Sequence, residues 1–146
     1  MRVWRISNFA DLSGAGGLYG DGRWHRRGVP VIYCADHPST SLLEILVHAS
    51  RVTVPDSYHL IEIDIPDGTS CFDPDLSGTP DWTKDLAYTQ SVGMGFFSDA
   101  RSAFMRVPSV VMPKARNLLI NPRHPDAGLA RIVDVDRYPF DSRLFS

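Results

Sequence analysis

The chain has 146 residues, and a hydrophobic content of 43% is enough for one sizeable core, so we expect a single domain spanning residues 1–146. Lys and Arg number 15 against 17 Asp and Glu, and the resulting net charge of −2 argues against direct binding to nucleic acid or to a membrane surface. No apolar stretch has the length of a signal peptide or a membrane span, which predicts a cytoplasmic location.

In chain order, the pattern predicts a strand over residues 2–6, a glycine-rich loop over 14–22 and a short buried strand over 31–34. Pro38 is well placed at the first turn of a helix that we expect to reach about residue 50. Clean alternation over 58–65, followed by a Pro-Asp-Gly turn, predicts a half-buried strand.

The second half of the chain is predicted to be mainly β. Residues 82–100 indicate a helix despite two glycines, and four further strands are separated by prolines. These strands are expected at residues 103–107, 110–112, 118–120 and 130–135. The predicted fold class is therefore α+β, with mixed sheets and short helices.

The helix after Pro38 carries a narrow polar stripe. At 100° per residue its members fall within an arc of roughly 100°, while apolar residues fill the rest of the helix surface. The stripe consists of Thr40, Ser41, Glu44, His48 and Arg51. It points either at solvent, with Ser41 and Glu44 forming a capping box, or into a cleft that gives Glu44 a functional role.

Common catalytic motifs are absent from the sequence. The glycine-rich loop matches neither a P-loop nor a dinucleotide-binding fingerprint, and no nucleophile elbow occurs. The five histidines lack metal-binding spacing, and Cys34 and Cys71 belong to no ligand pattern, so we expect free thiols and no metal site. Spacing rules alone leave the function open.

Several ordered motifs extend over nearly the whole chain. They are Trp4-Arg5, the loop leading into Gly22-Arg23-Trp24, Pro30-Val31-Ile32-Tyr33, SLLEILVH at residues 41–48, RVPSVVMP at 106–113 and NLLINPRHP at 117–125. Together they resemble the RES-domain family, the toxin half of bacterial toxin–antitoxin pairs with an Xre-like antitoxin. One departure lies after Trp24, where His25-Arg26-Arg27-Gly28 replaces the asparagine and prolines expected in many relatives.

The resemblance implies a fold similar to the ADP-ribosyltransferase toxins and enzymes that degrade NAD by hydrolysis or phosphorolysis of the nicotinamide bond. Some members instead transfer ADP-ribose to a protein. The arginine, glutamate and serine that name the family map onto Arg23, Glu44 and Ser109. NAD would be the substrate, with no separate cofactor.

The expected chemistry suits these residue types. Cleavage of the nicotinamide–ribose bond leaves positive charge on the sugar, which the carboxylate of Glu44 would stabilise. A guanidinium offers paired donors to the pyrophosphate, and Arg23 or Arg5 would supply it. Tyr33 would stack on the nicotinamide cation. The predicted catalytic residues are thus Arg23, Tyr33 and Glu44.

Three further residues are predicted to bind the substrate, namely Arg5, Ser109 and Asn121. Each of the six also has an ordinary structural alternative, such as a surface cation, a core aromatic or a turn residue. Three functions stay open at this point, which are an NAD glycohydrolase or phosphorylase toxin, an ADP-ribosyltransferase and a non-catalytic binding module. The expected partner is an Xre-like helix-turn-helix antitoxin, and the sequence leaves a homodimer open.

Overall fold

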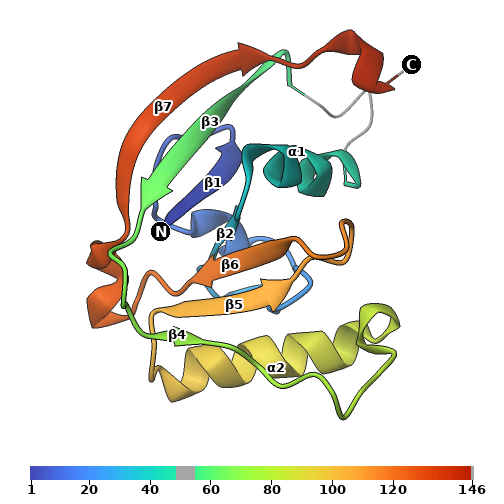
Figure 1. The fold of residues 1–146 in the computed structure, drawn as a ribbon, viewed down its shortest axis with the longest axis vertical. Coiled ribbons are helices and arrows are strands. Elements are labelled where there is room, and N and C mark those ends of the chain that lie inside the picture. Colours follow the sequence, from blue (N-terminus) through green and yellow to red (C-terminus); the bar gives the residue numbers. More distant parts are fainter. Residues whose placement is uncertain (49–54, 146) are drawn as a thin grey trace.

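The computed structural model describes residues 1–48 and 55–145, and within them one seven-stranded sheet organises the fold (Figure 1). The strand order is β4-β5-β6-β2-β1-β3-β7, and all neighbours are antiparallel except β4 and β5. The strands are β1 (Arg2–Ser7), β2 (Ile32–Ala35), β3 (Ser57–Asp64), β4 (Cys71–Phe72), β5 (Phe104–Pro108), β6 (Arg116–Ile120) and β7 (Arg131–Pro139).

The sheet is joined only narrowly at its centre. β1 pairs with β3 along its whole length, and β3 pairs in turn with β7, with a bulge between Glu62 and Ile63. By contrast, β1 and β2 share a single register pair, Trp4 opposite Ala35. The two halves therefore splay apart beside α1 (Pro38–Leu46), which contacts both β1 and β2 (Figure 1).

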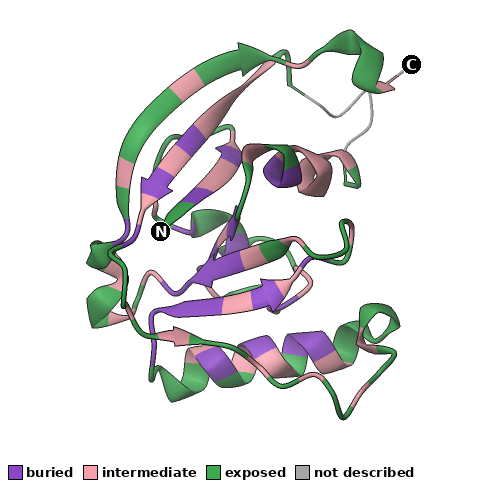
Figure 2. Ribbon diagram, viewed as in Figure 1, coloured by how far each residue is buried: buried purple, intermediate pink, exposed green. Residues whose placement is uncertain are grey.

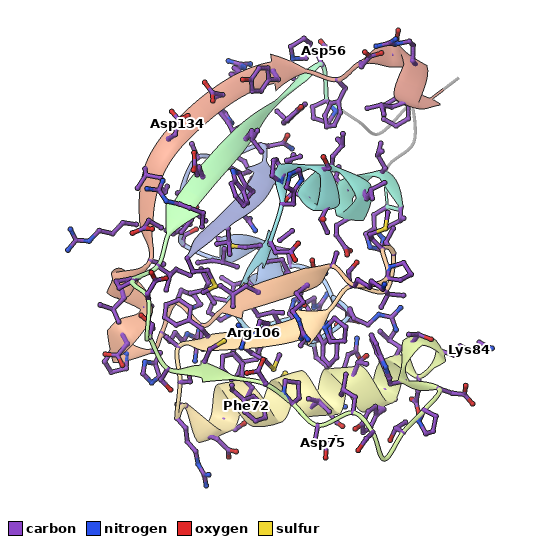
Figure 3. The ribbon with its side chains drawn as sticks, viewed as in Figure 1. Asp56, Phe72, Asp75, Lys84, Arg106 and Asp134 are labelled. Carbon is purple, nitrogen blue, oxygen red and sulfur yellow. The ribbon has the colours of Figure 1, made fainter. Side chains whose placement is uncertain are left out.

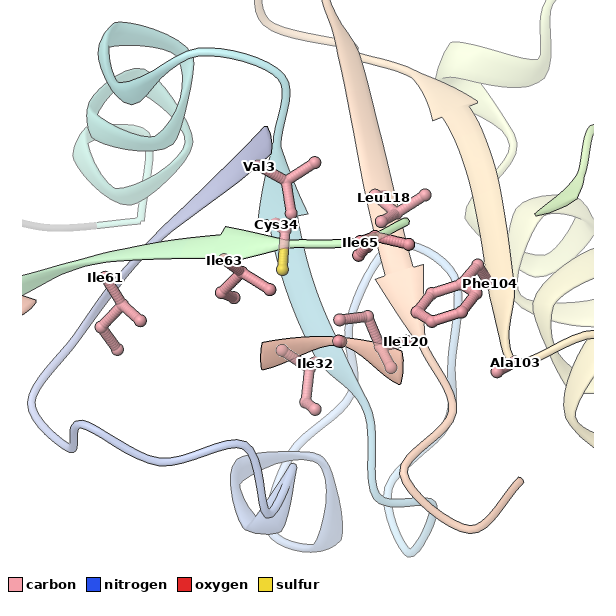
Figure 4. Close-up of a cluster of buried hydrophobic side chains, with 11 residues drawn as sticks. Val3, Ile32, Cys34, Ile61, Ile63, Ile65, Ala103, Phe104, Leu118 and Ile120 are labelled. Atoms are coloured by element: carbon pink, nitrogen blue, oxygen red, sulfur yellow. The ribbon is translucent and has the colours of Figure 1, made fainter. Parts of the chain in front are cut away.

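Strand alternation sends apolar side chains to both faces of the sheet. One buried cluster includes Ile32, Cys34, Leu118 and Ile120, together with residues of β1, β3 and β5 (Figure 4). The opposite face carries a second cluster in which α2 (Leu86–Asp99) packs over β5 and β6. Its buried members are Trp24, Val31, Phe96, Met105, Val107 and Leu119. Figure 2 shows the burial concentrated in these central strands, whereas β7 is largely exposed.

α2 approaches the chain around Trp24 very closely. A Cβ atom added at Gly93 would lie 1.5 Å from the carbonyl oxygen of Trp24, so only glycine allows this packing. Asp85 caps the N-terminus of α2 by accepting a hydrogen bond from the backbone N–H of Tyr88. The predicted helix over 82–100 is therefore confirmed as a short 3-10 turn (Trp82–Lys84) followed by α2.

α1 begins as predicted at Pro38, but its cap is His37, whose ring nitrogen accepts from the N–H of Ser39. The capping box of Ser41 and Glu44 is therefore wrong, because Ser41 lies inside the helix and donates to the carbonyl of Trp4 at 2.8 Å. α1 ends at Leu46, and residues 47 and 48 form a turn, so the prediction of a helix reaching about residue 50 is wrong at these two positions. Residues 49–51 lie outside the described residues.

The α+β class is confirmed, but some predicted strands differ. Residues 110–112 were predicted as a strand and instead form the turn between β5 and β6, because the hydroxyl of Ser109 accepts from the N–H groups of Val111 and Met112. β4 was not predicted, and β7 extends to Pro139 rather than residue 135. None of the helices in the described chain is long and apolar enough to cross a membrane.

Candidate active site

Glu44 points inward, toward the sheet. Its Oε1 atom accepts a hydrogen bond from the hydroxyl of Ser109 at 2.7 Å and another from the side-chain amide of Asn117 at 2.8 Å. α1 supplies the carboxylate, the turn after β5 supplies Ser109, and β6 supplies Asn117. Three segments that are distant in the sequence thus meet at one oxygen atom.

The first part of the polar stripe of α1, from Thr40 to Glu44, faces the protein rather than solvent. Thr40 and Ser41 are buried, and Glu44 is half-buried, whereas the apolar Val47 is 53% exposed. His48, the next member of the stripe, is exposed. The polar residues that join the helix to the sheet are therefore Ser41 and Glu44.

Both hydrogen bonds to Glu44 end on the same carboxylate oxygen. Among the described residues, no donor contacts Oε2, while both donors converge on Oε1. Ser109 is itself 7% exposed and fixed by two backbone N–H groups, so its hydroxyl proton is directed at the carboxylate. The arrangement holds the carboxylate in one orientation, with both contacts from the described residues on the same oxygen.

Tyr33 and Asn117 lie on the same face of the sheet. On β6, Asn117 and Leu119 are two residues apart and so share a face, and Leu119 stands opposite Tyr33 of β2, just as Asn117 stands opposite Ala35. The hydroxyl of Tyr33 accepts from the N–H of Trp24 at 3.3 Å and lies 2.7 Å from Nδ1 of His25. Burial raises the pKa of Tyr33 well above its usual range, partly offset by the Trp24 N–H, so its hydroxyl stays protonated.

His25 fixes the direction of that hydrogen bond. Its Nε2 lies 2.9 Å from the carbonyl oxygen of Gly20, which can only accept, so the proton of the neutral ring resides on Nε2. Nδ1 is then the acceptor, and Tyr33 donates to it. His25 is buried, with 4% of its surface exposed. Its hydrogen bonds connect the loop of residues 20–25, called the arginine loop below, to β2.

Arg23 extends from the arginine loop toward the start of α2. One guanidinium nitrogen donates to the carbonyl of Thr83 at 3.0 Å, next to Lys84, which Figure 3 labels. The loop is also secured by Gln90 of α2, whose side chain donates to the carbonyl of Gly22. No hydrogen bond or ion pair between described residues joins Arg23 to Glu44, so the two belong to separate networks.

Arg5 belongs to neither network directly. On β1 its neighbour Trp4 faces α1 and contacts the ring of His37, so alternation directs Arg5 to the opposite face. It donates to the carbonyl of Tyr33 at 3.4 Å, and its buried Nε has no hydrogen-bond partner within residues 1–48 and 55–145. Its role in substrate binding stays a prediction.

Asn121 lies in the turn after β6, away from the Glu44 contacts. Its side-chain oxygen accepts from the N–H of Arg123, and its backbone N–H donates to Ala103. The contacts match the turn-capping alternative, and binding of substrate by Asn121 stays a prediction.

Two cavities of the described fold lie away from the predicted catalytic residues. One of about 210 Å³ is apolar and borders Leu12 and Ile120, and the other, of about 360 Å³, lies between Phe72 of β4 and Phe96 of α2. Neither is lined by Arg23, Tyr33 or Glu44. The candidate site is therefore defined by the hydrogen bonds to Glu44 and by the face of the sheet that Tyr33 and Asn117 share.

Comparison with known families agrees with the motifs. Residues 2–141 match the model of the RES domain. The chain belongs to the RES domain family.

Relatives and a solved structure extend this assignment. Toxin Res of Pseudomonas putida KT2440 is 43% identical over 99% of this chain and 100% of its own length. The Prs ADP-ribosylating toxin of Sphingobium sp. YBL2 is 34% identical over 97% of this chain and 94% of its own. A chain from the crystal structure of the M. tuberculosis MbcT–MbcA toxin–antitoxin complex shares the fold, with a TM-score of 0.72, 20% identity and coverage of 94% and 84%.

Two residues of this RES-domain site were not predicted from the sequence. Asn117 is the first residue of the quoted motif at 117–125, and a polar amide within an otherwise apolar strand was the available signal. His25 was noticed only as a departure from the family pattern. The structure gives each a defined contact, Asn117 to Glu44 and His25 to Tyr33.

Proposed function

We propose that this RES-domain protein is the toxin of a toxin–antitoxin pair and that it cleaves the nicotinamide–ribose bond of NAD. The names of the relatives from Pseudomonas putida and Sphingobium support a toxin, and the second names an ADP-ribosylating activity, which requires cleavage of this bond. In the main proposal, water or phosphate would attack the ribose carbon and accept the ADP-ribosyl group as nicotinamide leaves. The acceptor distinguishes hydrolysis from phosphorolysis.

The observation that carries the proposal is the orientation of Glu44. Departure of nicotinamide leaves an oxocarbenium-like sugar, and a carboxylate fixed beside it stabilises the charge that develops in the transition state. Ser109 and Asn117 occupy Oε1, so Oε2 is the oxygen that would approach the ribose. Because both donors are already in place, little reorganisation is needed when the bond breaks.

Arg23 and Tyr33 would hold the two ends of the substrate. Thr83 uses one guanidinium nitrogen of Arg23, and the remaining donors are suited to a pyrophosphate. Tyr33 is half-buried with its hydroxyl bonded inward, so its accessible part is the ring, which suits stacking on the cationic nicotinamide. Metal is not part of this scheme, because the fixed carboxylate and guanidinium supply the charges.

A second function shares the same first step. In the ADP-ribosyltransferase alternative a protein side chain attacks the ribose carbon after nicotinamide leaves. The Sphingobium relative, named for ADP-ribosylation of Prs, favours keeping this alternative. We further propose that the protein acts in the cytoplasm and is neutralised by an Xre-like antitoxin. The similar fold was found in a chain of the MbcT–MbcA toxin–antitoxin complex, which supports an antitoxin as the partner of this protein.

One assay separates these possibilities. The purified protein is incubated with NAD, with and without phosphate and with cell lysate, and nicotinamide, ADP-ribose, its phosphate ester and labelled protein are quantified. Nicotinamide release with free ADP-ribose or its phosphate supports the main proposal, and labelled protein supports the alternative. No release of nicotinamide under any condition would contradict both and favour a non-catalytic module.

The matched variants are Glu44→Gln and Glu62→Gln. The first keeps an oxygen for Ser109 and Asn117 but removes the charge, so we expect turnover to fall on the order of 100-fold or more. The second makes the same change at a carboxylate of β3 that pairs with Arg2 at 3.2 Å. It should retain wild-type turnover.

A further inference from the structure

Asn117 is an unusual residue for its position in the sheet. β6 lies between β5 and β2, and the cross-strand neighbours of Asn117 are Val107 and Ala35, both buried and apolar. Asparagine is depleted in strands, and more so where its neighbours offer no hydrogen bonds. The fold alone would favour an apolar residue here.

The amide of Asn117 is only half satisfied. Its Nδ2 donates to Oε1 of Glu44 at 2.8 Å, whereas its Oδ1 is buried and has no hydrogen-bond partner in the described part of the chain. If the side-chain amide of Asn117 were reversed, its Oδ1 would face Oε1 of Glu44 and the carboxylate would lose this donor. The contact to Glu44 therefore determines the orientation of the amide. A buried carbonyl without a partner destabilises the folded state.

We propose that Asn117 is a positioning residue that holds the Glu44 carboxylate for the reaction at the expense of stability. This inference rests on the proposed cleavage of NAD. Ser109 alone bonds Oε1 from one direction and leaves the carboxylate free to rotate about that contact. The second donor, from β6, restricts the rotation and directs Oε2 away from the sheet.

The burial of Oδ1 also limits what Asn117 does with the substrate. An atom without solvent contact in the described structure does not meet a ligand unless neighbouring groups move. The carbonyl of Asn117 therefore does not bind NAD, and its amide acts through the hydrogen bond to Glu44. Its loss should lower the rate of bond cleavage much more than the binding of NAD.

The test replaces Asn117 with leucine, whose side chain has the same branching and number of heavy atoms but no polar atoms. In Asn117→Leu the unpartnered carbonyl and the donor disappear together. We expect kcat for nicotinamide release to fall about 10- to 100-fold, the factor for losing one hydrogen bond to a charged group. KM for NAD should change less than about threefold, and Tm should stay the same or rise.

A matched control is Thr89→Val, which replaces a buried polar side chain with an apolar one of similar shape. Thr89 lies on α2 and bonds backbone carbonyls of its own helix. Turnover should be unchanged in this variant. A Tm that falls by several degrees in Asn117→Leu, with activity lost in proportion to unfolded protein, would overturn the proposal, as would turnover within twofold of wild type.

A second measurement does not depend on activity. The side-chain amide of Asn117 is observed by ¹H–¹⁵N NMR in the wild type and in Glu44→Gln. A charge-assisted hydrogen bond shifts one amide proton downfield, and that shift should decrease when the charge is removed. An amide signal that does not respond to Glu44→Gln would refute the contact itself. Absence of NAD cleavage by the wild type would instead count against the proposed function.

Discussion

The hydroxyl of Ser109 donates to Oε1 of Glu44 over 2.7 Å, although 65 residues separate them in the sequence. Ser109 also accepts from the N–H groups of Val111 and Met112, so the same hydroxyl shapes the turn and orients the carboxylate. The turn between β5 and β6 and the candidate active site therefore depend on one another.

Ser109→Ala should lower both activity and stability, but unequally. The turn lies near the surface, where water can replace the lost acceptor, so we expect the free energy of unfolding to decrease by about 0.5–1.5 kcal/mol. Turnover should fall about tenfold or more, because Oε1 loses one of two donors. Denaturant unfolding and nicotinamide release measure the two effects. Ser102→Ala, which removes a buried hydroxyl bonded to Ser70 at the other end of β5, should lower stability only.

Tyr33→Phe should destabilise the arginine loop. Removing the hydroxyl leaves the N–H of Trp24 and Nδ1 of His25 without their partner in a buried setting. The expected loss is about 1–3 kcal/mol of unfolding free energy, read from urea titration. Tyr19→Phe is the control, because Tyr19 is 79% exposed and should show no change. Equal stability of the two variants would contradict the bonding of Tyr33.

Two glycines of α2 should respond in opposite directions to alanine. At Gly93 the added Cβ would overlap the carbonyl of Trp24, and we expect a loss of about 3 kcal/mol or more. At Gly95 nothing lies within 4 Å, so alanine should stabilise the helix by up to about 1 kcal/mol. Thermal unfolding of both variants tests the packing of α2 on the arginine loop. A tolerated Gly93→Ala would show that α2 lies farther from Trp24.

The two thiols should differ in reactivity. Burial raises the pKa of Cys34 from 9.0 to about 12, with a smaller opposing effect from the charge of Arg5. Because the folded pKa is the higher one, this thiol stabilises the fold fully below about pH 9, and the contribution is lost as pH rises from there toward 12. Iodoacetamide at pH 8 should therefore modify half-buried Cys71 and leave Cys34 intact until unfolding, as peptide mass spectrometry would show. Rapid labelling of Cys34 would be inconsistent with its burial.

Much of the fold was predictable because its signals are local. The alternation of residues 58–65 and the proline at residue 38 correctly predicted β3 and the start of α1. Residues 110–112 were wrongly assigned because an apolar run of three looks like a strand, while the deciding interaction is the side chain of Ser109. β4, with two residues, is too short to leave a periodic pattern.

The candidate site was predictable only in part. The motifs indicated Glu44 and Ser109, whose contact the structure shows, but they gave no reason to select Asn117 over Asn121. That distinction depends on the pairing of β6 with β2, which sets the face of the sheet each side chain occupies. Pairing between strands more than 80 residues apart is not encoded in any local window.

The attachment of α1 has a dynamic consequence. The helix is joined to the sheet through polar contacts, from Ser41 to Trp4 and from Glu44 to Ser109 and Asn117, while Val47 is turned to solvent. α1 is only nine residues long and is followed by the exposed Val47 and His48, whereas β6 is paired with a strand on each side, so α1 should open locally and its amide hydrogens should exchange with deuterium sooner than those of β6. Each opening would also separate the carboxylate from its donors, so the fraction of time α1 stays closed would set the fraction of molecules competent to react.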